Sequence, residues 1–259
     1  MNKRKETLIL IFSIFLLFSL NYKTLDGLLI KFLDEKEYFY VERVIDGDTV
    51  SGNNKTIRLL GINAPEKNEP YYEEAKKFLE KEVLNKTVSL KFEKEKKDKY
   101  GRTLAYLFLN EENINLKSIE NGFSNYYFPS GRSKEYNNFK KSWLSCLEKN
   151  INLCERSDDV CAYCIKIVSI NSEEDTMGFY NFCDFSCNLE NWTIKNEGRK
   201  RFIFPKFVVN GKNYFYIFKG NNTNSKEVLF WPENDILVKD SDSLFLRDSS
   251  GKLVDWKEV

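Results

Sequence analysis

The sequence predicts two folded parts in tandem: an α+β part built on a five-stranded OB-type barrel with three helices, followed by an all-β sandwich. Short β-like runs alternate with amphipathic helical stretches between residues 38 and 157. From residue 158 onward almost every segment has the β-branched and aromatic enrichment of a strand. Of the 259 residues, 42% are hydrophobic and 15% are aromatic, which is enough apolar surface for buried cores.

In the first part, residues 38–157, strands are predicted in the segments YFYVERVI, TVSGNNKTIRLL, TVSLKFEKE and RTLAYLFL, with a hairpin turn at the Gly-Asn-Asn stretch of the second. Helices are predicted over residues 70–84, 113–122 and 133–150. Proline opens the first helix, glycine ends the second and serine caps the third. Helices packed on a small barrel form an OB-type domain, whose open face binds oligonucleotides.

In the second part, residues 158–259, strands are predicted in the segments CIKIVSI, GFYNFCDF, NWTIKN, RFIFPKFVV, NYFYIFKG, EVLFWP and DSLFLRD. Asn, Gly and Asp turns separate these short strands, which is the pattern of an all-β sandwich. This part holds 13 basic and 16 acidic residues. Because its surface is mildly acidic, it is a poor candidate for general DNA binding. We place the domain boundary near Ser157.

Residues 1–22 have the pattern of a secretory signal or an N-terminal membrane anchor. Lys3, Arg4 and Lys5 precede an uncharged run, Leu8 to Leu20, that is apolar on every face. The run is shorter than the roughly 20 residues of a full membrane span. No small-x-small cleavage pattern follows it, which favours an uncleaved anchor over a removed signal. The basic end would stay inside, so we expect an extracytoplasmic protein, membrane-anchored or secreted, with residues 23–37 as a linker.

The charge balance and the residue types narrow the function. The chain carries 40 Lys and Arg against 39 Asp and Glu, so no overall basic field marks a nucleic-acid binder, although a nuclease needs positive charge only along its groove. The chain contains no histidine. Histidine-dependent triads, histidine general bases and His-containing zinc sites are therefore excluded. Acid–base chemistry must use carboxylates, Tyr, Lys or Cys.

The segments VIDGDTV and RLLGINAPE contain residue types that suit phosphodiester hydrolysis, which needs an activated water, positive charge and usually a divalent cation. Oxygen atoms of Asp48 and Asn63, with a nearby backbone carbonyl, would make a partial shell for Ca²⁺. Glu66 is close enough in sequence to orient or deprotonate a water. Arg58 and Arg102 would supply guanidinium groups for phosphate oxygens.

Each of these pieces also has an ordinary structural explanation. Asp-Gly-Asp is common in solvated turns, a single arginine on a strand is commonly a surface ion-pair partner, and DKYGR can be a simple turn before a strand. The spacing of an EF-hand loop is absent. The specificity of the signal therefore lies in the combination of segments.

The segments VIDGDTV, IRLLGINAPE and DKYGRTLAY, in this order and at these spacings, resemble the staphylococcal nuclease (thermonuclease) family over about residues 38–155. The resemblance implies a five-stranded OB-type barrel with three helices. It also implies Ca²⁺-dependent cleavage of DNA and RNA at the 5′ P–O bond, leaving 3′-phosphate ends. The implied roles are metal ligation by Asp48 and the Ala64 carbonyl, transition-state stabilisation by Arg58 and Arg102, general-base catalysis by Glu66, and nucleotide binding by Lys99 and Tyr100. Tyr126 or Tyr127 would also flank the substrate.

Asn63 departs from this family pattern, in which an aspartate usually supplies a second carboxylate ligand. An amide oxygen can still coordinate Ca²⁺, but the site loses one negative charge. Because Arg58, Glu66 and Arg102 are all present, we expect an active nuclease with weakened Ca²⁺ binding. The alternative is a catalytically weak or silent nucleic-acid-binding protein that uses the barrel as a docking surface. A third alternative is an envelope scaffold in which both parts bind only protein.

The segments NLENWTIKNEGRKRFIFPKF, LFW and DSLFLRDSSGKLVDW resemble the lamin-tail domain family over about residues 160–256. This resemblance implies an immunoglobulin-like sandwich that acts as a binding module, without catalytic residues and with an unknown partner. Asn191 stands where a glycine commonly precedes the tryptophan. We predict Trp192 and Trp231 to be core residues.

The six cysteines stand at positions 146, 154, 161, 164, 183 and 187. The last four have a spacing that a four-thiolate zinc site could use. An even number of cysteines in an extracytoplasmic protein favours disulfides instead. Three bridges allow many connectivities, and the sequence alone does not select one.

Overall fold

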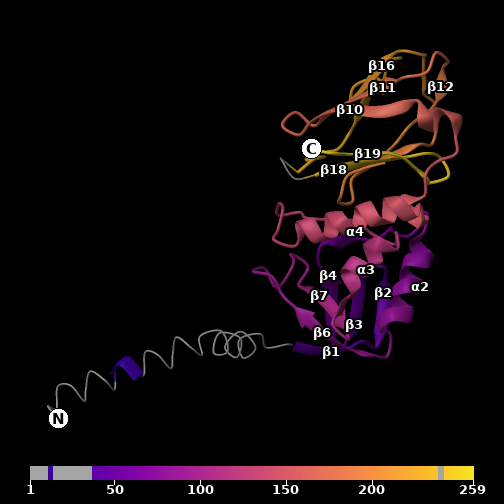
Figure 1. The fold of residues 1–259 in the computed structure, drawn as a ribbon. Coiled ribbons are helices and arrows are strands. Elements are labelled where there is room, and N and C mark those ends of the chain that lie inside the picture. The colour runs from indigo at the N-terminus through magenta and orange to yellow at the C-terminus, as the bar shows by residue number, and fades with distance from the viewer. Residues whose placement is uncertain (1–10, 14–36, 239–241) are drawn as a thin grey trace, which may run out of the picture. The chain divides into compact units, whose positions relative to one another are not determined.

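The computed structural model describes residues 11–13, 37–238 and 242–259, and its ribbon is drawn in Figure 1. Residues 38–259 form one compact unit. Except for residues 11–13, the predicted leader and linker up to residue 36 lie outside the described residues. Within the described ranges, no helix has both the length and the apolar character that a membrane crossing requires.

The sheet of the N-terminal part contains seven strands. In spatial order they are β1 (Glu37–Tyr40), β6 (Thr87–Lys91), β7 (Thr103–Leu109), β4 (Lys55–Leu59), β3 (Thr49–Gly52) and β2 (Arg43–Asp46), with β8 (Glu112–Asn113) paired to β7. The sequence predicts five strands because it shows neither that the first run bends into β1 and β2 nor that the two residues of β8 pair with β7. At this bend Val41 donates to the Lys86 carbonyl beside β6, whereas Glu42 donates to Ser51 of β3. The two ends of the sheet are thus joined by the chain itself.

The predicted hairpin turn between β3 and β4 is confirmed. Asn53 and Asn54 have φ angles of 46° and 58°, and they connect the paired residues Gly52 and Lys55. Two successive residues with positive φ match the right-handed twist of the flanking strands. Asparagine tolerates this backbone conformation better than most residues.

Three helices cover this sheet, as predicted. They are α2 (Tyr72–Val83), α3 (Ile114–Glu120) and α4 (Tyr136–Lys149), and the short 3₁₀ helices η1 (Asn152–Cys154) and η2 (Val160–Tyr163) follow. Figure 1 shows α2 beside β2, and α3 packs against both β7 and α4. The third helix begins later than predicted, and the prediction that a serine caps it is wrong. Glu135 is the N-cap residue, and the Ser133 hydroxyl accepts a hydrogen bond from the Glu135 N–H in the turn before the helix.

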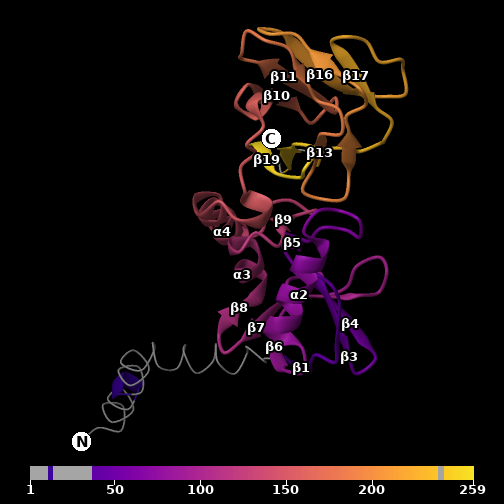
Figure 2. The same ribbon diagram turned by 90° about the vertical axis from the view of Figure 1, so that its right-hand side faces the viewer.

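The C-terminal part consists almost entirely of strands. One sheet contains β10 (Ile165–Asn171), β11 (Thr176–Asn181), β16 (Tyr214–Lys219) and β17 (Val228–Trp231) in that order, and Figure 2 shows its last three strands side by side. The other contains β14 (Arg201–Ile203), β13 (Thr193–Lys195), β18 (Ser243–Arg247) and β19 (Leu253–Glu258). A small ladder joins β12 (Cys187–Asn188) to β15 (Val208–Val209). Both four-stranded sheets contribute side chains to one hydrophobic core. Trp192 and Trp231 are core residues, as predicted, with 1% of each exposed.

Strand β18 is buried on both faces. Phe245 belongs to the hydrophobic core of the N-terminal part, whereas its neighbours Leu244 and Leu246 belong to the C-terminal core. Successive side chains of a strand point to opposite faces, so β18 lies between the two cores. The Phe245 ring packs edge-on against Trp143 of α4, with ring centroids 5.1 Å apart.

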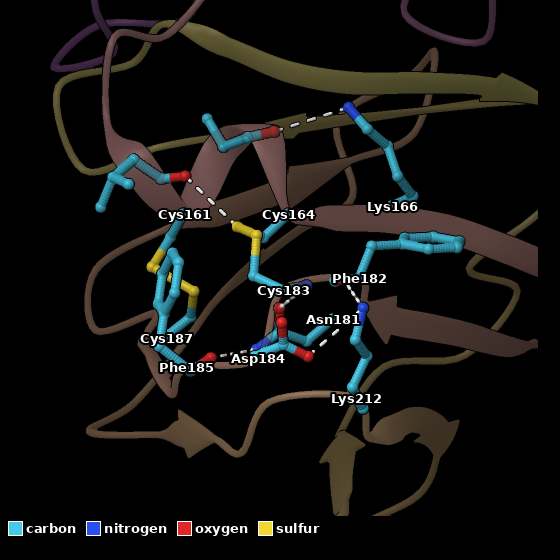
Figure 3. The surroundings of a disulfide bond; sticks show 12 residues. Cys161, Cys164, Lys166, Asn181, Phe182, Cys183, Asp184, Phe185, Cys187 and Lys212 are labelled. Atoms are coloured by element: carbon cyan, nitrogen blue, oxygen red, sulfur yellow. Dashed lines mark hydrogen bonds and ion pairs between the residues drawn. A yellow bond between two sulfur atoms is a disulfide. The ribbon is translucent and has the colours of Figure 1, made fainter.

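All six cysteines are paired, so the thiolates of a zinc site are not available. The pairs are Cys146–Cys154, Cys161–Cys187 and Cys164–Cys183. Figure 3 shows the last two, which tie the segment around η2 to the segment that follows β11. The prediction of disulfides is therefore confirmed, and the structure supplies the connectivity that the sequence left open.

Candidate active site

Asp48 is held in the tight turn between β2 and β3. Only 4% of this residue is exposed. Its Oδ2 accepts a hydrogen bond of 2.9 Å from the backbone N–H of Ala64, and its Oδ1 accepts one of 2.9 Å from the Thr49 hydroxyl. A Cβ atom on Gly47 would lie 2.7 Å from the Cβ of Ala64. Glycine at position 47 therefore permits the close approach that brings Asp48 to the segment of Ala64.

Arg58 joins the two predicted metal ligands Asp48 and Asn63. Its Nη2 lies 3.0 Å from Oδ2 of Asp48 and donates to Oδ1 of Asn63 over 3.4 Å. Its Nη1 donates to the backbone carbonyl of Leu59. Only 6% of Arg58 is exposed, and a charge buried this deeply needs such partners. The guanidinium thus lies between the oxygen atoms that the sequence assigns to a metal.

A second carboxylate, Asp46, adds negative charge beside Asp48. Burial, together with the neighbouring charge of Asp48, raises the pKa of Asp46 to about 6. Two carboxylates that resist joint ionisation indicate a place where an added cation is favourable.

Asn63 has two different partners at the two ends of its amide. While Oδ1 faces the Arg58 guanidinium, Nδ2 donates a hydrogen bond of 2.7 Å to the backbone carbonyl of Gly198. A guanidinium only donates and a carbonyl only accepts, so the two partners together fix the orientation of the amide. An aspartate in this place would have no proton for the Gly198 carbonyl. This contact gives a structural reason for the departure from the family pattern.

The oxygen atoms of this cluster suit a hard divalent cation. Asp48, Asn63 and Ala64 provide a carboxylate, an amide oxygen and a backbone carbonyl, which are the donor types that Ca²⁺ uses. Asn125 pairs with Asn63 across strands β5 (Ile62–Asn63) and β9 (Asn125–Tyr126), and its Oδ1 is buried without a partner in the described chain. In the described ranges no group of three or more His, Cys, Asp or Glu side chains forms a metal cluster. The donor set therefore fits a cation through one carboxylate together with amide and carbonyl oxygens.

Glu66 lies at the edge of the cluster, where its side chain is 44% exposed. Its Oε1 lies 2.7 Å from Nε of Arg199, a residue of the C-terminal part. Its backbone N–H donates to the Glu69 carboxylate over 2.8 Å, which shapes the turn before α2. Glu66 is thus accessible to water and substrate, as a general base must be.

Arg102, Lys99 and Tyr100 form a separate group in the turn before β7. The Nε of Arg102 lies 2.7 Å from the Asp98 carboxylate, and its guanidinium lies over the Tyr100 ring at 5.5 Å. The ammonium of Lys99 also lies over this ring, at 5.1 Å, and 68% of Tyr100 is exposed. Among the described residues, Arg102 has its contacts with Asp98 and Tyr100. Its role at the phosphate therefore stays a prediction.

Two tyrosines that the sequence could not distinguish have different environments. Tyr126 is fully buried, and its hydroxyl is hydrogen-bonded to Ser243, so it is a core residue. Tyr127 is half-buried near the site: burial raises the pKa of its hydroxyl, and the nearby charges of Arg58 and Arg199 act in the opposite direction. Tyr127 is therefore the candidate for contact with substrate.

The residues missed by the sequence analysis come from the turn between β13 and β14. Gly198 and Arg199 contact Asn63 and Glu66, although more than 130 residues separate them along the chain. The sequence does contain one signal, the basic stretch Gly-Arg-Lys-Arg inside an otherwise acidic half. Only the folded structure connects this stretch with the predicted site.

Comparisons with known proteins show the family to which this chain belongs. The family described as "Staphylococcal nuclease homologue" matches residues 56–153. The thermonuclease of Staphylococcus intermedius is 35% identical over 130 residues, covering 46% of this chain and 77% of that protein. The thermonuclease of Staphylococcus hyicus is 34% identical over 128 residues, covering 45% and 76%. An uncharacterized endonuclease of Haemophilus influenzae is 38% identical over 95 residues, covering 35% and 52%. With these relatives, and with Asp48, Arg58, Asn63, Ala64 and Glu66 gathered at one place, the chain belongs to the staphylococcal nuclease family.

Proposed function

We propose that the chain is a Ca²⁺-dependent endonuclease that hydrolyses phosphodiester bonds of DNA, RNA or both and leaves 3′-phosphate ends. The observation that carries this proposal is the convergence of Asp48, Arg58 and Asn63, with Glu66 exposed at the edge of the cluster. Relatives named thermonuclease and endonuclease support the same reaction class.

The proposed ligands of Ca²⁺ are the Asp48 carboxylate, the Asn63 amide oxygen and the Ala64 carbonyl. Bound Ca²⁺ would supply positive charge for the phosphate oxygens. Glu66 takes a proton from the attacking water, whose oxygen forms a bond to phosphorus while the bond to the 5′ oxygen breaks. The leaving 5′ oxygen takes a proton from solvent, so the products are a 3′-phosphate and a 5′-hydroxyl. Arg58 turns from its carboxylate partner to the phosphate, where its guanidinium stabilises the developing charge.

The group formed by Lys99, Tyr100 and Arg102 is proposed as the nucleotide pocket. An exposed aromatic ring with two cationic side chains close to it offers a stacking surface and two charges for the phosphate chain. For Arg102 to act on the reacting phosphate, as the family resemblance implies, its guanidinium must leave Asp98.

The wider architecture is part of the proposal. We assign residues 38–157 to an OB-type barrel domain and residues 158–259 to a lamin-tail-like, immunoglobulin-like sandwich that acts as a binding module. Two four-stranded sheets around one core support the second assignment. We also propose an extracytoplasmic location, with the N-terminal segment as a membrane anchor or a secretion signal, because three disulfides are typical of oxidising compartments.

The decisive experiment measures cleavage of labelled DNA and RNA by the purified chain, with Ca²⁺ and with a chelator. We expect cleavage only with Ca²⁺. Glu66→Gln should lower the rate by roughly 10²- to 10⁴-fold, because the amide cannot accept the proton of water. Glu73→Gln, the same change at an exposed position of α2, is the matched control and should leave the rate unchanged.

The alternative function is nucleic-acid binding without efficient cleavage. The same preparation distinguishes it, because a silent binder would retain a labelled oligonucleotide in both buffers and leave it intact. Absence of Ca²⁺-dependent cleavage together with such retention would overturn the enzyme proposal in favour of this alternative.

A further inference from the structure

The turn between β13 and β14, residues 196–200, docks on the segment that carries the proposed metal and base residues. The Gly198 carbonyl accepts the hydrogen bond from Asn63, and Arg199 pairs with Glu66. At the foot of the turn, Lys195 Nζ lies 2.7 Å from the Glu69 carboxylate. The contacts follow the segment 63–69 from its start to its end.

The turn is also fixed from behind. Glu197 is 3% exposed, and its backbone N–H donates to Asp242 over 3.0 Å. Its carboxylate accepts hydrogen bonds from the Phe128 backbone N–H and from the Ser243 hydroxyl. Asn196 donates to the Ile236 carbonyl over 2.7 Å. These buried hydrogen bonds hold the turn in a fixed position beside the site.

Because Gly198 has no side chain, the turn can lie close to Tyr127. A Cβ atom at this position would lie 3.3 Å from Cε2 of Tyr127 and 3.3 Å from Oδ1 of Asn196. Both distances are tighter than an ordinary side-chain contact. The turn therefore covers one edge of Tyr127, and Arg199 is the next residue along it.

Arg199 is the most exposed of the four cationic side chains in and beside this turn. Its side chain is 56% exposed, and Glu66 is its ion-pair partner within the described part of the chain. Lys195 and Arg201 share the Glu69 carboxylate and Lys200 pairs with Glu233, and the side chains of all three are less exposed, at 11%, 32% and 38%. With Nε directed to Glu66, the planar guanidinium still has donors for a phosphate group.

Resting on the proposed function, we infer that Arg199 is a substrate-binding residue of the nuclease site, contributed by the C-terminal part. It binds a phosphate of a single-stranded polynucleotide beside Glu66 and holds the Glu66 carboxylate in position. The active site is then composite, because residues 48–102 supply the proposed metal, base and nucleotide groups while the β13–β14 turn supplies an additional guanidinium. An exposed ion pair is weak, so Glu66 can still exchange this contact for a water proton.

Binding of a short fluorescein-labelled single-stranded DNA, measured in chelator so that it stays intact, tests the inference directly. Arg199→Ala should weaken binding roughly 10- to 100-fold, as expected for a charge-assisted phosphate contact. The slope of log K against log salt should become shallower by about 0.7, the value for one lost contact to a single strand. The affinity of Arg199→Lys should fall between those of wild type and Arg199→Ala, because lysine keeps the charge without the planar guanidinium. Lys206→Ala removes one exposed charge from the same part of the chain and should change neither quantity.

Cleavage kinetics separate this inference from the proposed function. If wild type cleaves with Ca²⁺ and Glu66→Gln does not, the proposed function stands, and Arg199→Ala should lower kcat/KM mainly through a higher KM. If neither wild type nor Glu66→Gln cleaves, the enzyme proposal fails. The slope of log K against log salt then still tests whether Arg199 binds a phosphate. A variant Arg199→Ala that behaves like Lys206→Ala overturns the inference. Faster cleavage by Arg199→Ala also overturns it, since the pair with Glu66 would then restrain the base.

Discussion

At position 63 a single amide serves two partners with opposite requirements. Its oxygen faces Arg58 and its nitrogen donates to the Gly198 carbonyl. A carboxylate would satisfy the first partner and leave the second without a donor. The residue that reduces the negative charge of the proposed metal site thus also contributes a contact with the C-terminal part.

The substitution Asn63→Asp should therefore have two opposite effects. Without Ca²⁺, the free energy of unfolding should fall by roughly 1–3 kcal/mol, because the buried Gly198 carbonyl loses its hydrogen bond. The affinity for Ca²⁺ should rise, because the site regains a carboxylate ligand. Denaturant unfolding in chelator measures the first effect, and a Ca²⁺ titration of the melting temperature measures the second.

The control for this prediction is Asn68→Asp, the same change at an exposed position of the following turn. It should affect neither quantity. Unchanged stability of Asn63→Asp in chelator would show that the contact with Gly198 does not hold the two parts together. Unchanged Ca²⁺ affinity would remove Asn63 from the proposed ligands.

At the scale of single residues, the sequence predicted some of the contacts in the candidate site and missed others. Asp48, Arg58 and Asn63 were named from motif order, and the structure brings them within hydrogen-bonding distance. Arg102 was named with them but lies beside Asp98, because the turn before β7 supplies a nearer carboxylate. Arg199 was not named, since nothing local in a sequence shows which distant turn a glutamate will meet.

At the scale of elements, the β13–β14 turn has a buried acid with an unusual proton affinity. Burial raises the pKa of Glu197 to about 9, and the neighbouring Asp242 contributes in the same direction. In the unfolded chain this carboxyl group has its ordinary pKa of 4.5. Between these two values the folded protein holds a proton that the unfolded chain has lost.

The free energy of unfolding should consequently decrease as the pH rises from about 5 to about 9, because the folded state binds more protons in this window. Glu197→Gln should flatten this decrease and stabilise the protein at the alkaline end. The amide can accept from Phe128 through its oxygen and donate to Ser243 through its nitrogen, so both contacts of the carboxylate are kept. Denaturant midpoints across the pH range measure the effect.

Glu190→Gln, at an exposed position in the same part of the chain, serves as the control and should leave the pH profile of wild type intact. If Glu197→Gln showed the same dependence of unfolding free energy on pH as wild type, Glu197 would be ionised in the folded protein. Other groups would then hold the turn in place.

Elements with a local signal were predicted well. The Asn53–Asn54 hairpin and the three helices follow from turn chemistry and helical periodicity. Strand β19 was missed, because Leu253–Glu258 alternates poorly and its pairing depends on β18. The short ladders of β5 with β9 and of β12 with β15 were also missed, since two-residue strands exist only through their partners.

At the scale of the whole molecule, the change in residue pattern at Ser157 predicts a domain boundary. Residues 38–259 have two hydrophobic cores but form one compact unit. The reason lies in β18 and β19, whose residues Phe245, Leu253 and Trp256 pack with the N-terminal core. The sequence could not reveal this packing, because a strand buried on both faces resembles any other apolar run. Two cores that share a strand should lose their structure together.

The substitution Phe245→Ala tests this coupling. Phe245 is fully buried and contacts both Trp143 and Tyr126 of the N-terminal part. Its truncation should lower the free energy of unfolding by about 3–5 kcal/mol. Amide hydrogen exchange should become faster by the same factor in β7 of the N-terminal core and in β11 of the C-terminal core, because both strands open in one cooperative event.

Phe182→Ala is the matched control, since 49% of Phe182 is exposed and its removal leaves no cavity in either core. It should leave exchange in β7 at the wild-type rate. If Phe245→Ala accelerated exchange in β11 while β7 kept its protection, the two parts would open independently. The β13–β14 turn could then leave Asn63 and Glu66 without unfolding the barrel. Equal acceleration in both strands would instead mean that Arg199 stays beside Glu66 for as long as the nuclease part is folded.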